Sequence, residues 1–243
     1  MGEITKNTLF IVMPAYNEEA NIRAVARQWH EIALKYGNHS RLIIFNDGSK
    51  DNTWTILTEL EDELPRLTAI NKENSGHGAT LRTAYEYALG NGADYIFQTD
   101  SDGQTLTDDF PFFWENRDHY SAIIGHRKNR QDGFSRIVVT KVLRAVLLLI
   151  FHVNIPDANT PFRIMKRITL QTYLSRVPDG FNLTNVLLSV LMASAGENVL
   201  FVPISFRPRQ GGVNSINLRR IMGIGRQAVR DFLAIRKELK RTK

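Results

Sequence analysis

The sequence predicts an α/β fold with a mostly parallel sheet that is covered by helices on both faces. Before residue 104, four apolar runs of β type alternate with segments whose apolar residues recur with helical period. Each run ends in a polar loop, and a hydrophobic content of 43% over 243 residues is enough for a sizeable core. Such alternation implies crossover connections, which bring the carboxyl ends of the strands to one edge of the sheet, where α/β folds bind ligands.

The elements of this first part follow from periodicity and from helix-breaking residues. An apolar run over residues 9–13 stops at Pro14, and apolar residues at helical spacing then continue to residue 33. The pattern repeats twice before a fourth apolar run leads into an acidic loop. The expected strands cover residues 9–13, 41–45, 67–70 and 94–99, and the expected helices cover residues 18–33, 54–60 and 79–89.

The alternation becomes irregular after residue 120. Residues 121–125 and 199–204 predict two further strands, and residues 138–151 predict a strongly apolar helix. This helix fits either a buried position in the core or a position against lipid, where it could hold a prenyl chain. The longest apolar run, residues 145–151, is far shorter than the roughly 20 residues that a spanning helix needs. We therefore expect a protein that is soluble or bound to a membrane surface.

The basic residues are concentrated in the last part of the chain. Residues 216–243 carry nine Lys or Arg against two acidic residues, whereas the other residues are close to neutral in sum. Apolar residues lie among these cations up to residue 239, which predicts a basic amphipathic helix on an anionic membrane surface. A helix packed on the domain with a solvated basic face is the alternative. A near-neutral body argues against nucleic acid as a partner, and the absence of cysteine excludes disulfides and thiolate metal sites.

The loop after the fourth expected strand contains two carboxylates one residue apart, Asp100 and Asp102, followed by Gln104. Nothing basic stands beside the two acids, so they repel each other and a cation would relieve that repulsion. Mg²⁺ and Mn²⁺ prefer oxygen ligands, and Mg²⁺ commonly combines one or two protein carboxylates with water and substrate phosphates. The loop therefore predicts a metal-diphosphate site, with a solvated acidic turn as the alternative.

The other three loops carry groups that suit a nucleotide. The segment from Pro14 to residue 19 could bind a ligand or could simply begin a helix. Asp47 stands at a strand end, where a carboxylate can accept hydrogen bonds from a base ring or a ribose. Gly76 and Gly78 allow close backbone approach at a helix N-terminus, which favours a phosphate, and Arg82 follows one turn later.

Together these loops resemble the nucleotide-sugar half of the family 2 glycosyltransferases, and they are most similar to dolichyl- or polyprenyl-phosphate glycosyltransferases with a GT-A fold. The resemblance rests on four motifs in the family's order, VMPAYNEE (12–19), NDGSKDNT (46–53), NSGHGATLRTAY (74–85) and TDSDGQ (99–104). It extends over about residues 9–217. It implies a GT-A domain over residues 1–215, with a nucleotide-sugar half (1–104) and an acceptor half (105–215), followed by the basic amphipathic tail (216–243).

The resemblance also implies roles for particular residues. Nucleotide-sugar contacts are implied for Pro14, Ala15, Asn17, Glu18, Asp47, Gly76, Arg82, Asp100, Ser101 and Arg207. Metal ligation is implied for Asp100, Asp102 and Gln104, and contacts with the acceptor phosphate for Arg127, Arg136, Arg163 and Arg209. Catalytic roles are implied for Asp102, Arg127 and Asp157. The chain departs from the family at Pro161, where relatives have glycine, and near Asn182, where relatives often have a glutamate.

The activity implied is a metal-dependent, inverting transfer of a hexose from a nucleotide diphosphate sugar to a polyprenyl phosphate, with Mg²⁺ or Mn²⁺ as the cofactor. A phosphate acceptor is largely ionised at neutral pH, since its second pKa is about 6, and needs no dedicated base. The expected location is peripheral, at the cytoplasmic face of a membrane, and a homo-oligomer is left open. One alternative is transfer to a glycan hydroxyl, which needs a base such as Asp157. Another is a non-catalytic membrane or nucleic-acid binding protein, against which the intact pair of acids argues.

Overall fold

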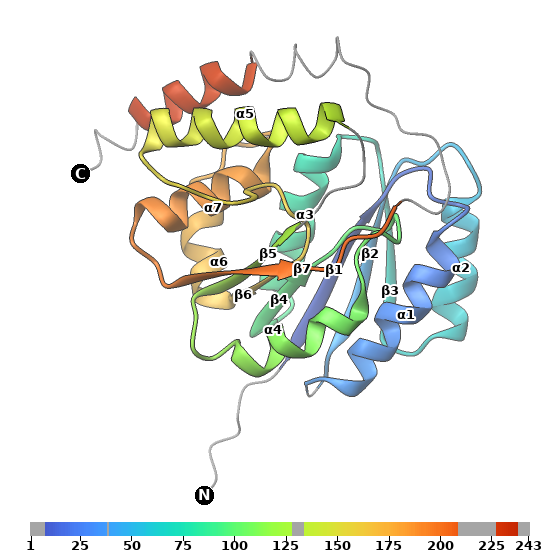
Figure 1. Cartoon of the computed structure of the whole chain (residues 1–243). Coiled ribbons are helices and arrows are strands. Elements are labelled where there is room, and N and C mark those ends of the chain that lie inside the picture. The colour runs from blue at the N-terminus through green and yellow to red at the C-terminus, as the bar shows by residue number, and fades with distance from the viewer. Residues whose placement is uncertain (1–7, 38, 128–133, 209–226, 238–243) are drawn as a thin grey trace, which may run out of the picture.

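Seven strands form one mixed sheet in the computed structural model, which describes residues 8–37, 39–127, 134–208 and 227–237 (Figure 1). The strand order is β3-β2-β1-β4-β6-β5-β7. Only β6 runs antiparallel to its neighbours, β4 and β5, and the other described pairs are parallel. The strands are β1 (Leu9–Ala15), β2 (Arg41–Asp47), β3 (Leu67–Lys72), β4 (Tyr95–Gln98), β5 (Ala122–Arg127), β6 (Arg163–Lys166) and β7 (Val199–Ile204).

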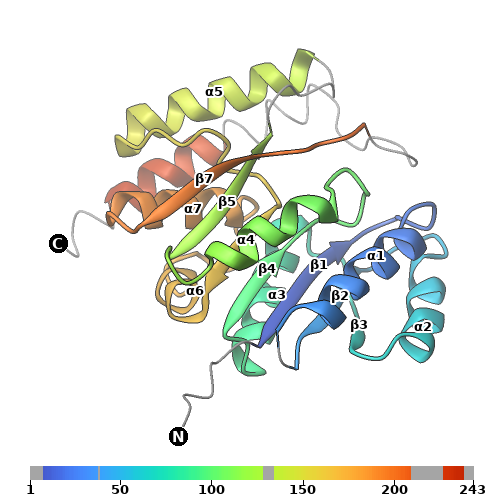
Figure 2. The same ribbon diagram turned by 60° about the horizontal axis from the view of Figure 1, so that its bottom comes forward.

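Helices cover both faces of this sheet. The helices are α1 (Ile22–Lys35), α2 (Thr53–Glu63), α3 (His77–Gly90), α4 (Phe110–Asn116), α5 (Phe134–Phe151), α6 (Arg167–Leu174) and α7 (Thr184–Ser194), with a further helix over residues 227–237. Because side chains alternate along a strand, Leu9, Ile11 and Met13 share one buried cluster with α1, α2 and α4. Phe10 and Val12 share the other with α3, α5, α6 and α7. Figure 2 shows α1 and α4 in front of the strands and α3 behind them.

The predicted fold class is confirmed, and each expected strand and helix before residue 104 is present. The sequence patterns did not reveal β6 or the helices α4, α6 and α7. Strand β6 has four residues, two of them charged, so it shows no apolar run and depends on pairing with β4 and β5. Helix α7 is buried along almost its whole length, so its apolar residues surround the axis and leave no periodic stripe.

The start of α3 lies unusually close to the segment that leads into α7. A Cβ atom on Gly78 would stand 2.4 Å from the carbonyl oxygens of Phe181 and Asn182, so only glycine fits at this contact. The hydroxyl of Thr184, the first residue of α7, donates a hydrogen bond of 2.8 Å to the Gly78 carbonyl. These contacts fix the N-terminus of α3 at the edge of the sheet that carries the predicted site.

Helix α5, which the sequence predicts either in the core or against lipid, has one buried side and one exposed side. In α5, Leu147 and Ile150 are buried in the core while Val142 and Leu149 are exposed, so the core interpretation holds for one side and the lipid interpretation stays a prediction for the other. Along the described residues, no helix is long and apolar enough to span a bilayer.

The described part of the basic tail forms a helix, as predicted, but its apolar side faces the protein. Phe232 is fully buried and contacts the rings of Phe151 and Phe181, and Ile235 lies in the same cluster. For Phe232 and Ile235 the structure shows the alternative, a helix packed on the domain, whereas Leu233 on the same helix is 52% exposed, so contact of the tail with a membrane stays a prediction. Other residues of the expected tail lie outside the described ranges.

Candidate active site

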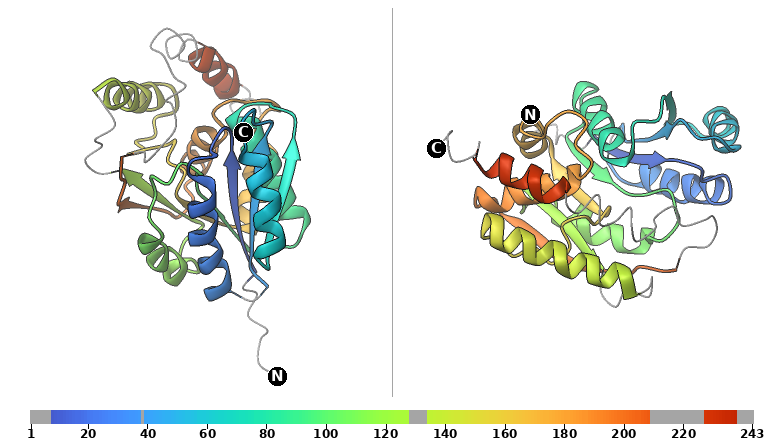
Figure 3. Two further views of the ribbon diagram at one scale, coloured as in Figure 1. Left: turned by 90° about the vertical axis from the view of Figure 1, so that its right-hand side faces the viewer. Right: turned by 90° about the horizontal axis from the view of Figure 1, so that it is seen from above.

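The topology brings almost all the predicted site residues to one edge of the sheet. The carboxyl ends of β1, β2, β3, β4, β5 and β7 point the same way, and the antiparallel β6 begins at that edge. The N-terminal end of the described chain lies at the opposite edge (Figures 1 and 3). Loops that are far apart in sequence therefore meet around the acidic segment that follows β4.

The loop after β1 is bound to the loop after β2 through its backbone. Asn17 has a left-handed φ of 54°, its N–H donates to Ser49 Oγ, and its Oδ1 accepts a bond from the N–H of Lys50. The Glu18 N–H donates to Thr53 Oγ1 at 2.8 Å. The same loop also meets the acidic segment, because the Ser101 hydroxyl donates to the Pro14 carbonyl, also at 2.8 Å. The predicted nucleotide residues of the first loop thus form one layer with the acidic segment.

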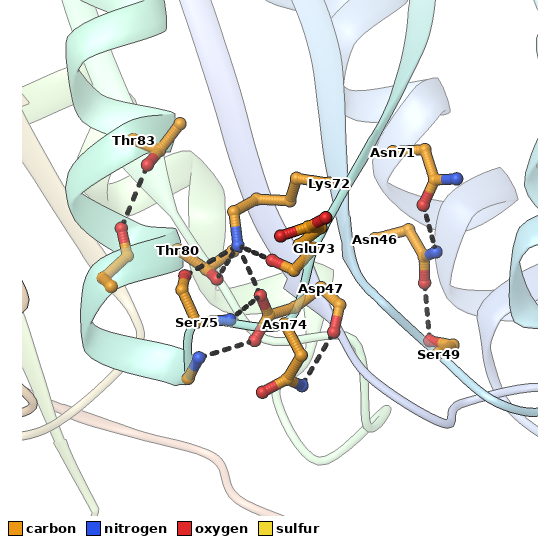
Figure 4. Close-up of polar contacts among 12 residues, drawn as sticks. Asn46, Asp47, Ser49, Asn71, Lys72, Glu73, Asn74, Ser75, Thr80 and Thr83 are labelled. Atoms are coloured by element: carbon orange, nitrogen blue, oxygen red, sulfur yellow. Dashed lines mark hydrogen bonds and ion pairs between the residues drawn. The ribbon is translucent and has the colours of Figure 1, made fainter.

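Asp47, the last residue of β2, is buried and accepts hydrogen bonds from the loop between β3 and α3 (Figure 4). Its Oδ1 accepts bonds from Lys72 Nζ at 2.5 Å and from the Ser75 N–H at 2.9 Å, and its Oδ2 accepts one from the Gly76 N–H at 3.0 Å. Burial acts to raise the pKa of Asp47, but the bonds from Lys72 and Ser75 hold the pKa below its ordinary value. The ionised carboxylate therefore orders the glycine loop that was predicted to receive a phosphate.

Sequence patterns did not identify Lys72 as part of this arrangement. The signal was present in the strand register, since Asp47 and Lys72 are direct partners on the parallel strands β2 and β3. A lone cation at a strand end opposite an acid is the pattern that would have revealed it. Its consequence is that a nucleotide meeting Asp47 also meets an adjacent ammonium group.

A buried chain of hydrogen bonds supports Asp100 from inside the protein. Gln98 Nε2 donates to Asp100 Oδ1 at 3.0 Å, Asn185 Nδ2 donates to Gln98 Oε1 at 2.9 Å, and the Tyr85 hydroxyl donates to Asn185 Oδ1 at 2.7 Å. Gln98, Asn185 and Tyr85 are all buried, and burial raises the pKa of the tyrosine, which keeps its proton available to donate. The chain fixes the orientation of the carboxylate. Its members are up to 100 residues apart, so sequence patterns could not join them.

The rest of the acidic segment pairs with the strand-like segment after β7. The Gln104 N–H donates to Asp102 Oδ1 at 3.1 Å, which holds the second carboxylate against its own loop. The Arg207 N–H donates to the Gln104 carbonyl at 2.9 Å, Gln104 Nε2 donates to the Arg207 carbonyl at 3.0 Å, and Thr105 forms a β-bridge with Phe206. The buried Nε atom of Arg207 has no hydrogen-bond partner among the described residues. The backbone of Arg207 is therefore fixed to the acidic segment at Gln104, while its Nε has a donor left for a ligand.

These groups fit a divalent cation that is completed by substrate. Asp100 and Asp102 supply two carboxylates, and the described residues contain no cluster of three or more His, Cys, Asp and Glu side chains. Mg²⁺ or Mn²⁺ bound here would need water and diphosphate oxygens to complete its shell, as these ions commonly do. Gln104 is buried, and its side-chain Nε2 donates to Arg207. Its side-chain oxygen, Oε1, is therefore the atom left for the predicted third contact.

Beside the acidic segment, Arg127 at the end of β5 forms a bidentate ion pair with Asp157. The Nε–Oδ2 distance is 2.7 Å and the Nη2–Oδ1 distance is 3.0 Å, and the two side chains are 11% and 5% exposed. The guanidinium also lies over the ring of Phe206, with its carbon 5.2 Å from the ring centroid. The two residues predicted to act at the acceptor are therefore in contact with each other and with the segment that pairs with the acidic loop.

Two predicted arginines have structural partners instead of facing the site. The Arg82 guanidinium donates to the carbonyl oxygen of Val177 and pairs with Asp179 at 3.0 Å, which turns it away from the nucleotide loops. Arg163 is fully buried and donates to the carbonyl oxygens of Ala158, Thr160 and Asn185. A contact with the acceptor phosphate is not available to Arg163 in this conformation, because none of its guanidinium is exposed. The side chain of Arg136 and the whole of Arg209 lie outside the described part of the chain.

The fold and the acidic segment together define an α/β protein of GT-A type, with polar loops gathered at one edge of the sheet and a pair of carboxylates after β4. Comparison with known proteins extends this result. The chain belongs to glycosyl transferase family 2, whose family model matches residues 10–174. It is therefore a family 2 glycosyltransferase enzyme.

Curated relatives are similar at low identity. The chain is 31% identical over 151 residues to the UDP-N-acetylglucosamine–dolichyl-phosphate N-acetylglucosaminyltransferase of Methanococcus voltae, a match that covers 55% of this chain and 57% of the relative. It is 21% identical over 217 residues to the undecaprenyl-phosphate 4-deoxy-4-formamido-L-arabinose transferase of Klebsiella pneumoniae (strain 342), covering 88% of this chain and 64% of the relative. The chain thus spans less than two thirds of the length of either relative.

A solved structure supports the fold. The glucosyl-3-phosphoglycerate synthase of Mycobacterium tuberculosis, in complex with Mn²⁺, UDP-glucose and phosphoglyceric acid, superposes with a TM-score of 0.69 at 17% identity. The superposition covers 95% of this chain and 80% of that one. At this identity the likeness establishes the architecture alone.

Proposed function

We propose that the chain is a metal-dependent, inverting glycosyltransferase that moves a hexose from a nucleotide diphosphate sugar to a polyprenyl phosphate. The observation that carries the proposal is the acidic segment, which is fixed from inside by Gln98 and from outside by the bonds to Arg207. Names of the curated relatives support a lipid-phosphate acceptor, and the bound UDP-glucose and Mn²⁺ of the solved structure support the donor and the cation.

The roles of the chain's own groups follow from their positions. The layer formed by Pro14, Asn17 and Asp47 would receive the nucleoside, and Lys72 and the loop at Gly76 would add positive charge and backbone N–H groups. Asp100 and Asp102 would hold Mg²⁺ or Mn²⁺, which when bound neutralises charge that develops on the leaving diphosphate. The remaining nucleotide residues of the prediction, Ala15, Glu18 and Ser101, lie within the same layer and complete the donor side.

The acceptor side is centred on Arg127. Its guanidinium is held by Asp157 and by the ring of Phe206, so it is preorganised next to the acidic segment, where a phosphate can approach. The guanidinium of Arg207, whose buried Nε has no hydrogen-bond partner among the described residues, would meet the same or the neighbouring phosphate. An acceptor phosphate that is already ionised attacks without losing a proton to the protein.

The second candidate is transfer to a glycan hydroxyl, which needs a general base. Asp157 is the carboxylate available for this, but it already accepts two hydrogen bonds from Arg127. A carboxylate held in this way is better suited to positioning a cation than to removing a proton, which favours the phosphate acceptor. The division into a domain over residues 1–215 and a tail over residues 216–243 remains a prediction, and the packing of Phe232 ties the two parts together.

The test is transfer of labelled hexose to a short-chain polyprenyl phosphate, with the product recovered in organic solvent. Asp102→Ala should lower transfer by about 100-fold or more, because the bound cation loses a ligand. It should also remove the stabilisation that Mn²⁺ and a nucleoside diphosphate give to the native protein in a thermal-shift assay. Asp62→Ala, which changes an exposed acid on α2, is the matched control and should behave like the wild type. Full transfer by the Asp102 variant without added metal would refute the proposal, and product that stays in water would favour the glycan.

A further inference from the structure

Helix α5 has an exposed apolar face on the side away from the core. Leu147 and Ile150 are buried against the domain, whereas Val142, Leu148 and Leu149 are 56%, 47% and 74% exposed. With 100° of rotation per residue, the three exposed side chains cluster on the surface opposite the two buried ones. A contiguous row of large apolar side chains on a soluble surface marks a contact site.

Cations accompany this face, and α5 carries no acid, while the helix over residues 227–237 beside it carries one, the half-buried Asp231. Lys141 and Arg144 are exposed on the same helix, and residues 134–151 contain no Asp or Glu. Arg144 Nε donates to Asn154 Oδ1 at 2.8 Å, which holds this cation at one border of the face. The neighbouring helix over residues 227–237, whose Arg236 contacts His152 just beyond α5, adds exposed Arg230 and Lys237.

The position of α5 relates this face to the active-site edge. In Figure 1, α5 lies across the end of the molecule to which the strands point, and the helix over residues 227–237 runs beside it. Figure 3 shows both helices at that end from two further directions. Helix α5 therefore lies at the end of the molecule where the parallel strands, β5 among them, have their carboxyl ends.

We propose that the outer face of α5, defined by Val142, Leu148 and Leu149 with Lys141 and Arg144, docks on a bilayer that contains anionic lipid. The apolar side chains enter the boundary between headgroups and acyl chains, and the cations contact anionic headgroups. The docking deepens the proposed function, since it would bring the acceptor edge to the surface in which a polyprenyl phosphate resides. Phe232 and Ile235 of the neighbouring helix are buried in the core and cannot serve as this contact.

A second copy of the chain is the less suitable occupant of this face. Symmetric pairing of two α5 helices would bring Lys141 and Arg144 toward their own counterparts, where like charges repel. Stable interfaces also take about 20–30 residues on each side, far more than this row of side chains provides. An anionic surface complements the cations and needs no large protein area.

The test is co-sedimentation of the full chain with vesicles, without any substrate. Vesicles of phosphatidylcholine with about 30% phosphatidylglycerol should bind the wild type more strongly than phosphatidylcholine alone, and added salt should weaken the difference. Leu149→Glu and Leu148→Glu should each lower the bound fraction about tenfold or more, and Lys141→Glu should lower it on anionic vesicles only. The matched control is Ile168→Glu, which changes a 68%-exposed residue on α6 at the opposite edge and should bind as the wild type does.

Circular dichroism and the Tm of each variant verify folding, since all four side chains are exposed. Equal vesicle binding by Leu149→Glu and the wild type would overturn the docking surface, as would no binding by the wild type. Light scattering without vesicles tests whether a second copy of the chain covers this face. A wild-type dimer that Leu149→Glu dissociates would assign the face to that second copy. Transfer to a short, water-soluble acceptor is measured in parallel. Absence of this transfer in the wild type would overturn the proposed function. Transfer by a protein that does not bind vesicles would overturn the α5 docking surface alone.

Discussion

Replacing Asp157 by asparagine removes the charge partner of Arg127 while it keeps the shape of the side chain. The pair is bidentate at 2.7 and 3.0 Å, and its side chains are only 11% and 5% exposed, so the guanidinium would be left almost buried without a counter-charge. Breaking a buried pair from one side costs about 3–5 kcal/mol, and the remaining Oδ1 acceptor of asparagine places this case near about 3 kcal/mol. For a chain of this size, that loss lowers Tm by about 6–12 °C.

Thermal unfolding followed by circular dichroism at neutral pH measures the effect, and a double-mutant cycle assigns it to the pair. Arg127→Met with Asp157→Leu replaces both charges by apolar groups, so the double variant should be more stable than either single variant with Met or Leu alone. The control is Asp179→Asn, which breaks an equally short contact with Arg82 at a side chain that is 93% exposed, and should shift Tm by about 2 °C or less. The reasoning is refuted if Asp157→Asn behaves like this control, or if the Met and Leu effects simply add.

Three further variants test the packing and electrostatics described above. Gly78→Ala should destabilise the chain by about 3 kcal/mol or more in urea unfolding, because its Cβ meets two carbonyl oxygens at 2.4 Å. The control Gly90→Ala, with open space around its Cβ, should be neutral or stabilising, and equal effects of the two variants would contradict the close approach at Gly78. The pKa of Asp47 is lower in the folded chain than in the unfolded chain, where it is about 3.9. In urea unfolding, the wild type should therefore be more stable than Asp47→Asn by a full margin above about pH 5, and this margin should shrink as the pH falls below about 3.9. A margin that grows in acid would contradict the lowered pKa. Phe232→Ala should lower the free energy of unfolding by about 3–5 kcal/mol and expose the helix over residues 227–237 to protease. Unchanged stability and protease resistance would show that this helix is not anchored in the core.

The part of the site that sequence could predict consists of residues that directly follow apolar strands. Asp47, Asp100 and Asp102 were singled out because a run of β-type residues ends shortly before each of them, and parallel strands carry such positions to one edge. The same reasoning overestimated two arginines. Arg82 and Arg163 stand at suitable sequence positions, but their direction depends on which carbonyl oxygens and acids the fold places nearby.

The sequence by itself determined the α/β class, the presence of the first four strands and the acidic segment, because hydrophobic period and chain-breaking residues are local properties. Tertiary structure alone decided that Asn185 supports Asp100 through Gln98, that Asp157 holds Arg127, and that the helix over residues 227–237 packs on the domain. It also decided which side of α5 is left exposed. The physical reason is that each of these depends on side chains that meet across long sequence separations. Such contacts are selected by burial and hydrogen bonding in the folded state and leave no periodic trace in the chain.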